Sequence, residues 1–425
     1  MKTKRAKTFL TFACALILSL SSFTAVFAAG DPIQAIDEDH PAQAAIAKIL
    51  QMPVGTNTPG ATFVFNVDAK TSDAPAIGPI EIKYDAADYD ASKGSVDGNT
   101  FSYRKESGDI FDDIDFPHAG SYVYEITEDK DASYQSADPN HEKLTYSGAK
   151  YTLTVLVKNK ENSAGVYIDT ISAVITEADN GEQTEDDKVD PSPDGSRMIF
   201  TNTFIKTNGP DKPDTPDPEE DDDATLSVSK TVSGDIGDKT RYFVFGLTVT
   251  APSLIPAGEI PAFYRAYVVD ASGVVSADDL KDTAKNNVPA GSVGTDAGGA
   301  YIKVATSGTT TINLKHGQKL VFVDTPVGTR YTVTETAVTN YITKIIVTYN
   351  SETPPTEIAG TATSERLIGE KTNSAAYDNK LDSSPITGLS LNDLPFAGMI
   401  ALAIGAVAVF IVAKTRKARK AASHN

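Results

Sequence analysis

Two short stretches with the same alternating pattern constrain the fold of this chain most. They are YEITE at 124–128 and YTVTE at 331–335, and both read aromatic, any residue, Ile or Val, Thr, Glu. Side chains of a β-strand alternate between two faces, so the aromatic residue, the branched residue and the glutamate share a face. An unpaired charge on an apolar face is costly. We therefore expect Glu128 and Glu335 to have a partner inside the protein.

The segments around these strands also repeat. FVFNV at 63–67 matches FVFGL at 243–247, and each follows a lysine-bearing segment and precedes the glutamate strand. Each half of the chain then closes on an aromatic-x-Asn pattern. This order predicts an internal duplication in which the loops differ in length.

A lysine shares the apolar face near the start of each half. In LSVSKTV at 226–232, alternation places Lys230 with the apolar residues of that strand. In AIAKIL at 45–50, strand periodicity places Lys48 on the same face as Ile46 and Leu50. A helical conformation would break this grouping. A single lysine of this kind is often a rim side chain that reaches solvent.

An asparagine closes each half on the apolar face. IFTNTF at 199–204 places Asn202 between two phenylalanines, and YDNKL at 377–381 places Asn379 between a tyrosine and a leucine. Lysine, glutamate and asparagine thus recur in one order in both halves. The repetition favours a shared role over two coincidental rim positions.

The chemistry open to such a trio is a Lys–Asn amide bond. Desolvation lowers the pKa of an amine, which makes the lysine a nucleophile, and it raises the pKa of a carboxylate. A protonated glutamate polarises the asparagine carboxamide and transfers protons as ammonia leaves. We therefore predict Glu128 and Glu335 as catalysts, with cross-links from Lys48 to Asn202 and from Lys230 to Asn379.

The stretch KTNGPDKPDTPDPEEDDD at 206–223 separates the two halves, because proline and like charges keep such a segment extended. It leaves a first domain at 31–205 and a second at 224–382. Many short β-branched runs bounded by turn residues predict an all-β fold of two tandem immunoglobulin-like β-sandwiches. The clearest predicted strands are 61–69, 150–159, 166–178, 242–251, 319–325 and 341–350.

Helical patterns are few. One candidate is DHPAQAAIAKIL at 39–50, which overlaps the first lysine segment. The other is SADDLKDTAKN at 276–286, which reads as a short helix within a loop.

The N-terminus predicts export. A basic segment and an apolar run precede Val26-Phe27-Ala28, so residues 1–28 read as a signal peptide that is cleaved after Ala28. The single cysteine, Cys14, lies in this apolar run. The mature chain would therefore lack the disulfides that many exported proteins use.

The C-terminus predicts a membrane anchor before a further processing step. Residues 394–413 form an apolar run long enough to span a bilayer, and the basic tail at 414–425 places that end inside the cell. The preceding segment, 383–393, contains SPITG and a spacer.

SPITG resembles the cell-wall sorting signals of Gram-positive surface proteins, which have a Pro-x-Thr-Gly core before a hydrophobic stretch and a basic tail. By this resemblance, a sortase would cut between Thr387 and Gly388 and join the threonine to an amine. Serine stands where leucine is usual. LPFAG at 394–398 is an alternative motif, with alanine in place of threonine. The motif residues are Ser384, Pro385, Ile386, Thr387 and Gly388.

The lysine, glutamate and asparagine segments resemble the pilin isopeptide-linkage domains of Gram-positive bacteria. In those domains a lysine on an early strand is joined to an asparagine on the last strand beside a catalytic glutamate. GSYVYEITED and LSVSKTVSGDIGDKTRYFVFGL carry the likeness. Asn379 departs from it, because it stands in YDNK and not in the usual Asn-Thr setting. The resemblance implies a sortase, and peptidoglycan or another pilin subunit, as partners.

Other classes of function have less support. The formal net charge of −19 argues against nucleic acid and anionic membrane surfaces as partners, although solubility alone accounts for such acidity. DIFDDIDF at 109–116 lacks the glycine and final glutamate of a calcium loop. The five histidines make no metal-ligand spacing, and no phosphate-binding glycine loop is present. We expect no metal and no cofactor.

The leading hypothesis is a structural protein anchored to the cell wall, either a pilin subunit or a single stalk. A polymerising pilin needs a donor lysine, and Lys188, in the predicted loop before the last strand of the first domain, is a candidate. The alternative is an adhesin that binds a host or matrix ligand through loops such as 251–300. An enzyme acting on an external substrate has no supporting constellation.

Overall fold

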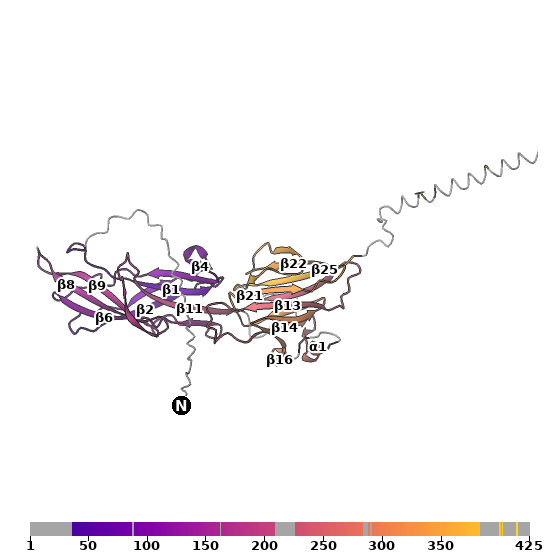
Figure 1. Ribbon diagram of the computed structural model, residues 1–425, viewed down its shortest axis with the longest axis horizontal. Coiled ribbons are helices and arrows are strands. Elements are labelled where there is room, and N and C mark those ends of the chain that lie inside the picture. The colour runs from indigo at the N-terminus through magenta and orange to yellow at the C-terminus, as the bar shows by residue number, and fades with distance from the viewer. Residues whose placement is uncertain are drawn as a thin grey trace, which may run out of the picture.

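A computed structural model describes residues 36–86, 89–161, 163–208, 226–283, 288–289 and 291–382, together with 399–400, 402 and 414. The predicted all-β class is confirmed, since strands dominate the described residues. Two β domains follow one another along the long axis of the molecule (Figure 1). The short α1 (Ala277–Lys281) and a 3₁₀ turn at Ala91–Lys93 are the helical elements within the described part of the two domains.

The first domain has two sheets. Neighbours in one sheet are, in order, β20 (Thr325–Pro326), β11 (Met198–Asn208), β1 (Ile46–Pro53), β5 (Thr100–Glu106) and β4 (Ser95–Asp97), with β7 (Glu142–Thr145) also beside β11. Neighbours in the other are β10 (Gln183–Val189), β9 (Val166–Glu177), β8 (Lys150–Asn159), β6 (Gly120–Asp129), β2 (Ala61–Ala69) and β3 (Ile80–Tyr84). The lysine and asparagine strands therefore lie in one sheet and the glutamate strand in the other.

The second domain repeats this division. Its larger sheet contains β16 (Val293–Asp296), β17 (Gly299–Ala305), β14 (Phe263–Asp270), β19 (Gln318–Phe322), β12 (Ser227–Ser233), β25 (Ser374–Lys380), β22 (Ile342–Thr348) and β23 (Thr356–Ala359), with β15 (Gly273–Val274) beside β14. Its smaller sheet contains β18 (Thr309–Leu314), β13 (Phe243–Thr250), β21 (Arg330–Glu335) and β24 (Arg366–Leu367).

In both domains the first and last strands are parallel neighbours. β1 pairs with β11 in the first domain, and β12 pairs with β25 in the second. Strands that are distant in sequence are thus hydrogen-bonded side by side in the middle of a sheet. This topology is what brings a residue near the start of each domain beside one near its end.

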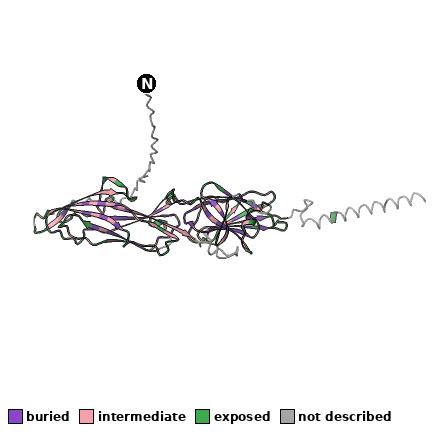
Figure 2. Ribbon diagram, turned by 90° about the horizontal axis from the view of Figure 1, so that it is seen from below, coloured by how far each residue is buried: buried purple, intermediate pink, exposed green. Residues whose placement is uncertain are grey.

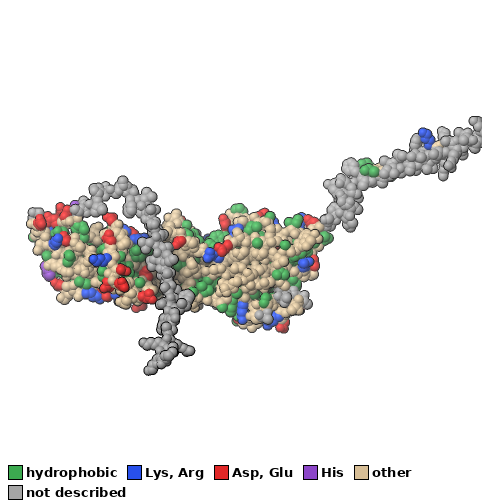
Figure 3. Space-filling view, in the orientation of Figure 1, with side chains coloured by type: hydrophobic (Ala, Val, Ile, Leu, Met, Phe, Trp, Pro, Cys, Tyr) green, Lys and Arg blue, Asp and Glu red, His purple; other side chains and the backbone are tan. Residues whose placement is uncertain are grey.

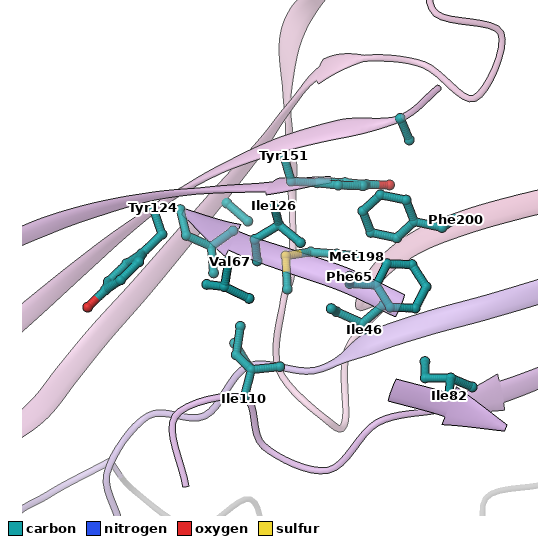
Figure 4. Packing of buried hydrophobic residues seen from close by; sticks show 14 of the residues in the cluster. Ile46, Phe65, Val67, Ile82, Ile110, Tyr124, Ile126, Tyr151, Met198 and Phe200 are labelled. Atoms are coloured by element: carbon teal, nitrogen blue, oxygen red, sulfur yellow. The ribbon is translucent and has the colours of Figure 1, made fainter. Parts of the chain in front are cut away.

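One apolar core fills each domain. In the first domain Phe65 and Ile126 of one sheet lie near Ile46 and Phe200 of the other (Figure 4). Buried residues follow the strands through the interior of both domains (Figure 2). Burial of each large apolar side chain stabilises the fold by about 1.5–3 kcal/mol, so these cores can stabilise the domains without disulfide bonds.

The two domains are joined by more than the intervening segment. β11 runs past Lys206, the first residue of the predicted linker, and its end pairs with β20 of the second domain. Glu370 of the second domain accepts hydrogen bonds from the backbone nitrogen of Asn57 at 2.6 Å and from Lys206 Nζ at 3.2 Å. Gly328 packs so closely on Pro53 that an added Cβ would lie 2.4 Å from the proline Cβ.

Most predicted strands are confirmed, and two other expectations are wrong. Residues 39–50 contain no helix, because β1 begins at Ile46 and is held between β5 and β11. Pairing on both edges outweighs the helix propensity of an alanine-rich segment. The region 251–300 is not one long loop, since it contains β14, β15, α1 and β16. The short helix expected within 276–286 is present as α1.

Several predicted segments lie outside the described residues. These are the signal peptide, its cleavage site at Ala28, the linker from 209 onward, the sorting motif Ser384–Gly388 and most of 394–413. Among the residues that the structure does describe, no helix is long and apolar enough to cross a membrane.

Candidate functional site

A buried hydrogen-bonded trio lies in the first domain. Lys48 Nζ donates to Glu128 Oε1 at 2.9 Å, and Asn202 Nδ2 donates to the same oxygen at 2.8 Å. Lys48 and Asn202 are 0% exposed and Glu128 is 6% exposed. The three predicted residues are therefore brought together, and the glutamate oxygen stands between the amine and the carboxamide.

Strand register explains this placement. On the paired strands β1 and β11, Lys48 stands opposite Phe200 and Leu50 stands opposite Asn202, so the lysine and the asparagine lie two residues apart on the same face. Glu128 reaches them from β6 in the other sheet, where it pairs with Phe65. The trio thus spans the interior between the two sheets.

The lysine is surrounded by aromatic rings. Lys48 Nζ lies 4.7 Å from the ring centroid of Phe63 and 5.7 Å from that of Phe65. Burial lowers the pKa of Lys48 to about 8, although the attraction of Glu128 opposes the shift. Burial thus disfavours the charged form of the lysine, and a neutral amine is the form that acts as a nucleophile.

A backbone group completes the first site. The amide nitrogen of Ser147 donates to Asn202 Oδ1 at 2.6 Å and to Glu128 Oε2 at 3.2 Å. Ser147 lies between β7 and β8, and its side chain is turned to Asp179. Strand alternation does not identify such a donor, because any residue in the loop has a backbone N–H.

A second trio occupies the second domain. Lys230 Nζ donates to Glu335 Oε2 at 2.9 Å, and Asn379 Nδ2 donates to Glu335 Oε1. Lys230 and Glu335 are each 1% exposed and Asn379 is 0% exposed. The geometry supports the placement of Asn379 despite its unusual sequence setting.

The second trio repeats the register of the first. Lys230 stands opposite Tyr377 on the parallel pair, and Val232 stands opposite Asn379. Glu335 pairs with Phe245, as Glu128 pairs with the matching phenylalanine of the first domain. The repeat predicted from the two FVF segments is thus a repeat of three-dimensional geometry.

The surroundings of the second trio agree in one respect and differ in another. Lys230 Nζ lies 4.4 Å from the ring centroid of Phe243, and burial lowers the lysine pKa to about 8. Asn379 Oδ1, however, is buried without a hydrogen-bond partner among the described residues. The second site therefore has no counterpart of the Ser147 donor within the described residues.

The remaining candidate residues lie elsewhere. Glu125 points away from the core, as alternation predicts, and pairs with Lys70 at 2.9 Å. Asp109 accepts backbone hydrogen bonds from Ala44 and Phe111, so it holds the acidic loop in place. Lys188 is exposed on β10, the outermost strand of its sheet, and so the expectation of a loop there is wrong.

The side chains of both lysine–glutamate pairs are fully buried. Acidic side chains gather over the first domain on the face shown in Figure 3, yet both catalytic glutamate candidates are buried beneath the surface. No group of three or more acidic, histidine or cysteine side chains suited to a metal occurs within the described residues. The arrangement of each site is suited to a reaction among its own side chains.

Comparisons with known proteins match each of the two domains to a different family. Residues 44–205 match the Spy0128-like isopeptide containing domain, and residues 224–374 match a domain of unknown function (DUF7601). A pilin from Streptococcus pyogenes serotype M1 is 28% identical over 198 residues, which are 45% of this chain and 49% of the relative. The chain thus aligns with about half the length of that relative. The match of residues 44–205 agrees with the likeness to pilin isopeptide-linkage domains that the sequence of the first domain shows.

Solved structures of similar proteins include two major pilins of Streptococcus pyogenes. One is 20% identical, with 81% of this chain and all of that chain covered and a TM-score of 0.33. The other is 18% identical, with 80% and 99% covered and a TM-score of 0.30.

Proposed function

We propose that this chain is a structural protein of the cell surface, a pilin subunit or stalk, in which each domain cross-links itself. The bonds join Lys48 to Asn202 and Lys230 to Asn379. The observation that carries the proposal is the same buried lysine–glutamate–asparagine trio, at the same strand register, in both domains.

The reaction balances within each trio. The neutral amine of the lysine attacks Cγ of the asparagine, and the bond from Cγ to Nδ2 breaks. The glutamate accepts a proton from the attacking nitrogen and donates one to the departing nitrogen, which leaves as ammonia. A secondary amide remains, and no oxidant or cofactor is needed.

The position of each bond suits a load-bearing protein. Each cross-link connects the first and last strands, so it closes a loop of about 150 residues and stabilises the fold by about 5 kcal/mol. Tension that enters at β1 and leaves at β11 passes through the Lys48–Asn202 bond. The strands inside the loop then carry none of it.

Anchoring is the second part of the proposal. A sortase would cut SPITG after Thr387 and join the chain to peptidoglycan or to another pilin subunit. A ladder of high-mass species in cell-wall extracts would support a polymerising pilin, and a single anchored species would support a stalk. Lys188 is exposed and remains the candidate donor lysine.

Peptide mapping tests the cross-links directly. A tryptic digest of the segment 30–383 should contain two branched peptides, one through Lys48 and Asn202 and one through Lys230 and Asn379. Linear peptides at all four residues would contradict the proposal. The adhesin alternative is tested separately, by binding of the same segment to matrix proteins.

A further inference from the structure

We propose that the backbone N–H of Ser147 stabilises the oxyanion during bond formation in the first domain, and that Asp179 is the residue that positions it. This inference rests on the proposed cross-linking reaction and adds a group to it. The carboxamide oxygen of Asn202, Oδ1, accepts a hydrogen bond from the Ser147 N–H at 2.6 Å.

The contacts orient the Asn202 carboxamide for reaction. Its nitrogen donates to Glu128 Oε1, the group that must protonate the leaving nitrogen. Its oxygen faces the N–H of Ser147, so the two ends of the carboxamide are distinguished by their partners. When the amine of Lys48 adds to Cγ, negative charge develops on Oδ1, where a fixed donor already stands. Donors of this kind stabilise a transition state because they need not reorganise.

Asp179 holds this donor in place from the turn after β9. Its side-chain oxygen Oδ1 accepts hydrogen bonds from the hydroxyl of Ser147 and from the backbone nitrogen of Thr201 at 2.9 Å. Its backbone oxygen accepts from the nitrogen of Gly148 at 2.6 Å. Asp179 therefore holds the loop that contains Ser147 through hydrogen bonds to both its own side chain and its own backbone oxygen.

Gly148 shows how close this attachment is. A Cβ added at Gly148 would lie 2.8 Å from the backbone nitrogen of Gly181 and 2.9 Å from its Cα. Contacts below 3.0 Å with backbone atoms require the loop to move. Gly148→Ala is therefore expected to displace the Ser147 N–H without changing any residue of the trio.

The charge of Asp179 has an effect distinct from its position. Two negative charges favour the charged form of Lys48, that of Glu128 on β6, which accepts its hydrogen bond, and that of Asp179 in the turn after β9, which acts without direct contact. Lys105, opposite on β5, is turned toward the carbonyl of Lys83 and the ring of Tyr84. Removal of the Asp179 charge alone should therefore lower the pKa of Lys48.

The experiment measures both bonds in one chain. The full chain is synthesised in a cell-free system, and samples are quenched in denaturant at intervals and digested. The branched peptide through Asn202 reports the first bond, and the one through Asn379 is the internal reference. The variants are Gly148→Ala, Asp179→Ala and Asp179→Asn, and the last retains an oxygen that accepts from Ser147 and Thr201.

We expect Gly148→Ala and Asp179→Ala to slow the first bond by between about tenfold and 10²-fold, and the second bond not at all. Asp179→Asn should retain the wild-type rate at neutral pH. Both Asp179 variants should shift the fall of the rate at alkaline pH to lower pH in the first bond, a change that loop damage alone does not produce.

Three results would overturn the inference. They are an unchanged first-bond rate in both Gly148→Ala and Asp179→Ala, an equal loss of rate in Asp179→Asn and Asp179→Ala, and an alkaline limb that does not move. Absence of both branched peptides from the wild-type chain is a different result, because it would reject the proposed function itself.

Discussion

The two domains share a trio but not its surroundings. Lys48 and Lys230 stand at the same register on parallel first and last strands, and each contacts a glutamate from the opposite sheet. In the first domain Asn202 Oδ1 accepts a backbone hydrogen bond from Ser147, whereas Asn379 Oδ1 has no partner within the described residues. Strand register therefore brings the lysine, glutamate and asparagine of each domain together, whereas the hydrogen bond to the carboxamide oxygen depends on the adjacent loop.

The glutamates provide the largest test of what the domains share. Glu128→Ala and Glu335→Ala should each abolish the bond in their own domain and leave the other bond intact, because general acid–base groups contribute about 10²–10⁴-fold. Peptide mapping measures each bond separately. Glu125→Ala is the matched control, since this residue lies on β6 but faces Lys70 outside the core. Loss of a bond in that control would contradict the assignment.

Stability should respond to each bond in turn. Asn202→Ala and Asn379→Ala should each lower the free energy of unfolding of their domain by about 5 kcal/mol, since each opens a covalent loop of about 150 residues. Chemical denaturation monitored in both domains measures the change. Equal stability of the variants and the wild type would show that no loop had been closed.

The difference between the domains should appear in their rates. Because a fixed oxyanion donor contributes about 10²-fold or more, we expect the Lys48–Asn202 bond to form faster than the Lys230–Asn379 bond by on the order of 10²-fold. A time course of the two branched peptides in newly synthesised chain gives both rates. Equal rates would mean that the loop at Ser147 has no kinetic role.

Alkaline pH should slow both reactions alike. In the proposed reactive form of each lysine–glutamate pair, the lysine is neutral and the glutamate holds the proton that the two groups share. The ion pair differs only in that this proton is on the lysine, so the two forms contain the same number of protons. Burial lowers the pKa of Lys48 and Lys230 to about 8, so above this pH each pair loses its last proton and with it the acid. We expect a rate that falls about tenfold per pH unit above pH 8. A rate that rises through pH 9 would contradict the role of a protonated glutamate.

Much of the trio was predictable from alternation alone. The period of two in a strand placed all six side chains on apolar faces, and burial of Lys230 and Asn379 confirms it. The loop donor was not predictable, because a backbone N–H at Ser147 has no residue signature. The helix expected at residues 39–50 was wrong for a different reason. Helix propensity depends on the local sequence, whereas the pairing of β1 with β5 and β11 depends on segments distant in the sequence.

The position of the domain boundary shows the same limit. Prolines and acidic residues indicated a linker from Lys206, but β11 extends to Asn208 because the second domain supplies β20 as a partner. A partner strand from another domain has no local signal in the segment that it extends. The terminal predictions, including the sorting motif, lie outside the described residues and stay predictions.

The intact mass of the segment 30–383 tests the central claim most directly. We predict a mass lower than the sequence mass by two molecules of ammonia, with one restored by Glu128→Ala and the other by Glu335→Ala. A deficit of one would confine the reaction to a single domain. The full sequence mass would contradict the account, because neither buried trio would then have reacted.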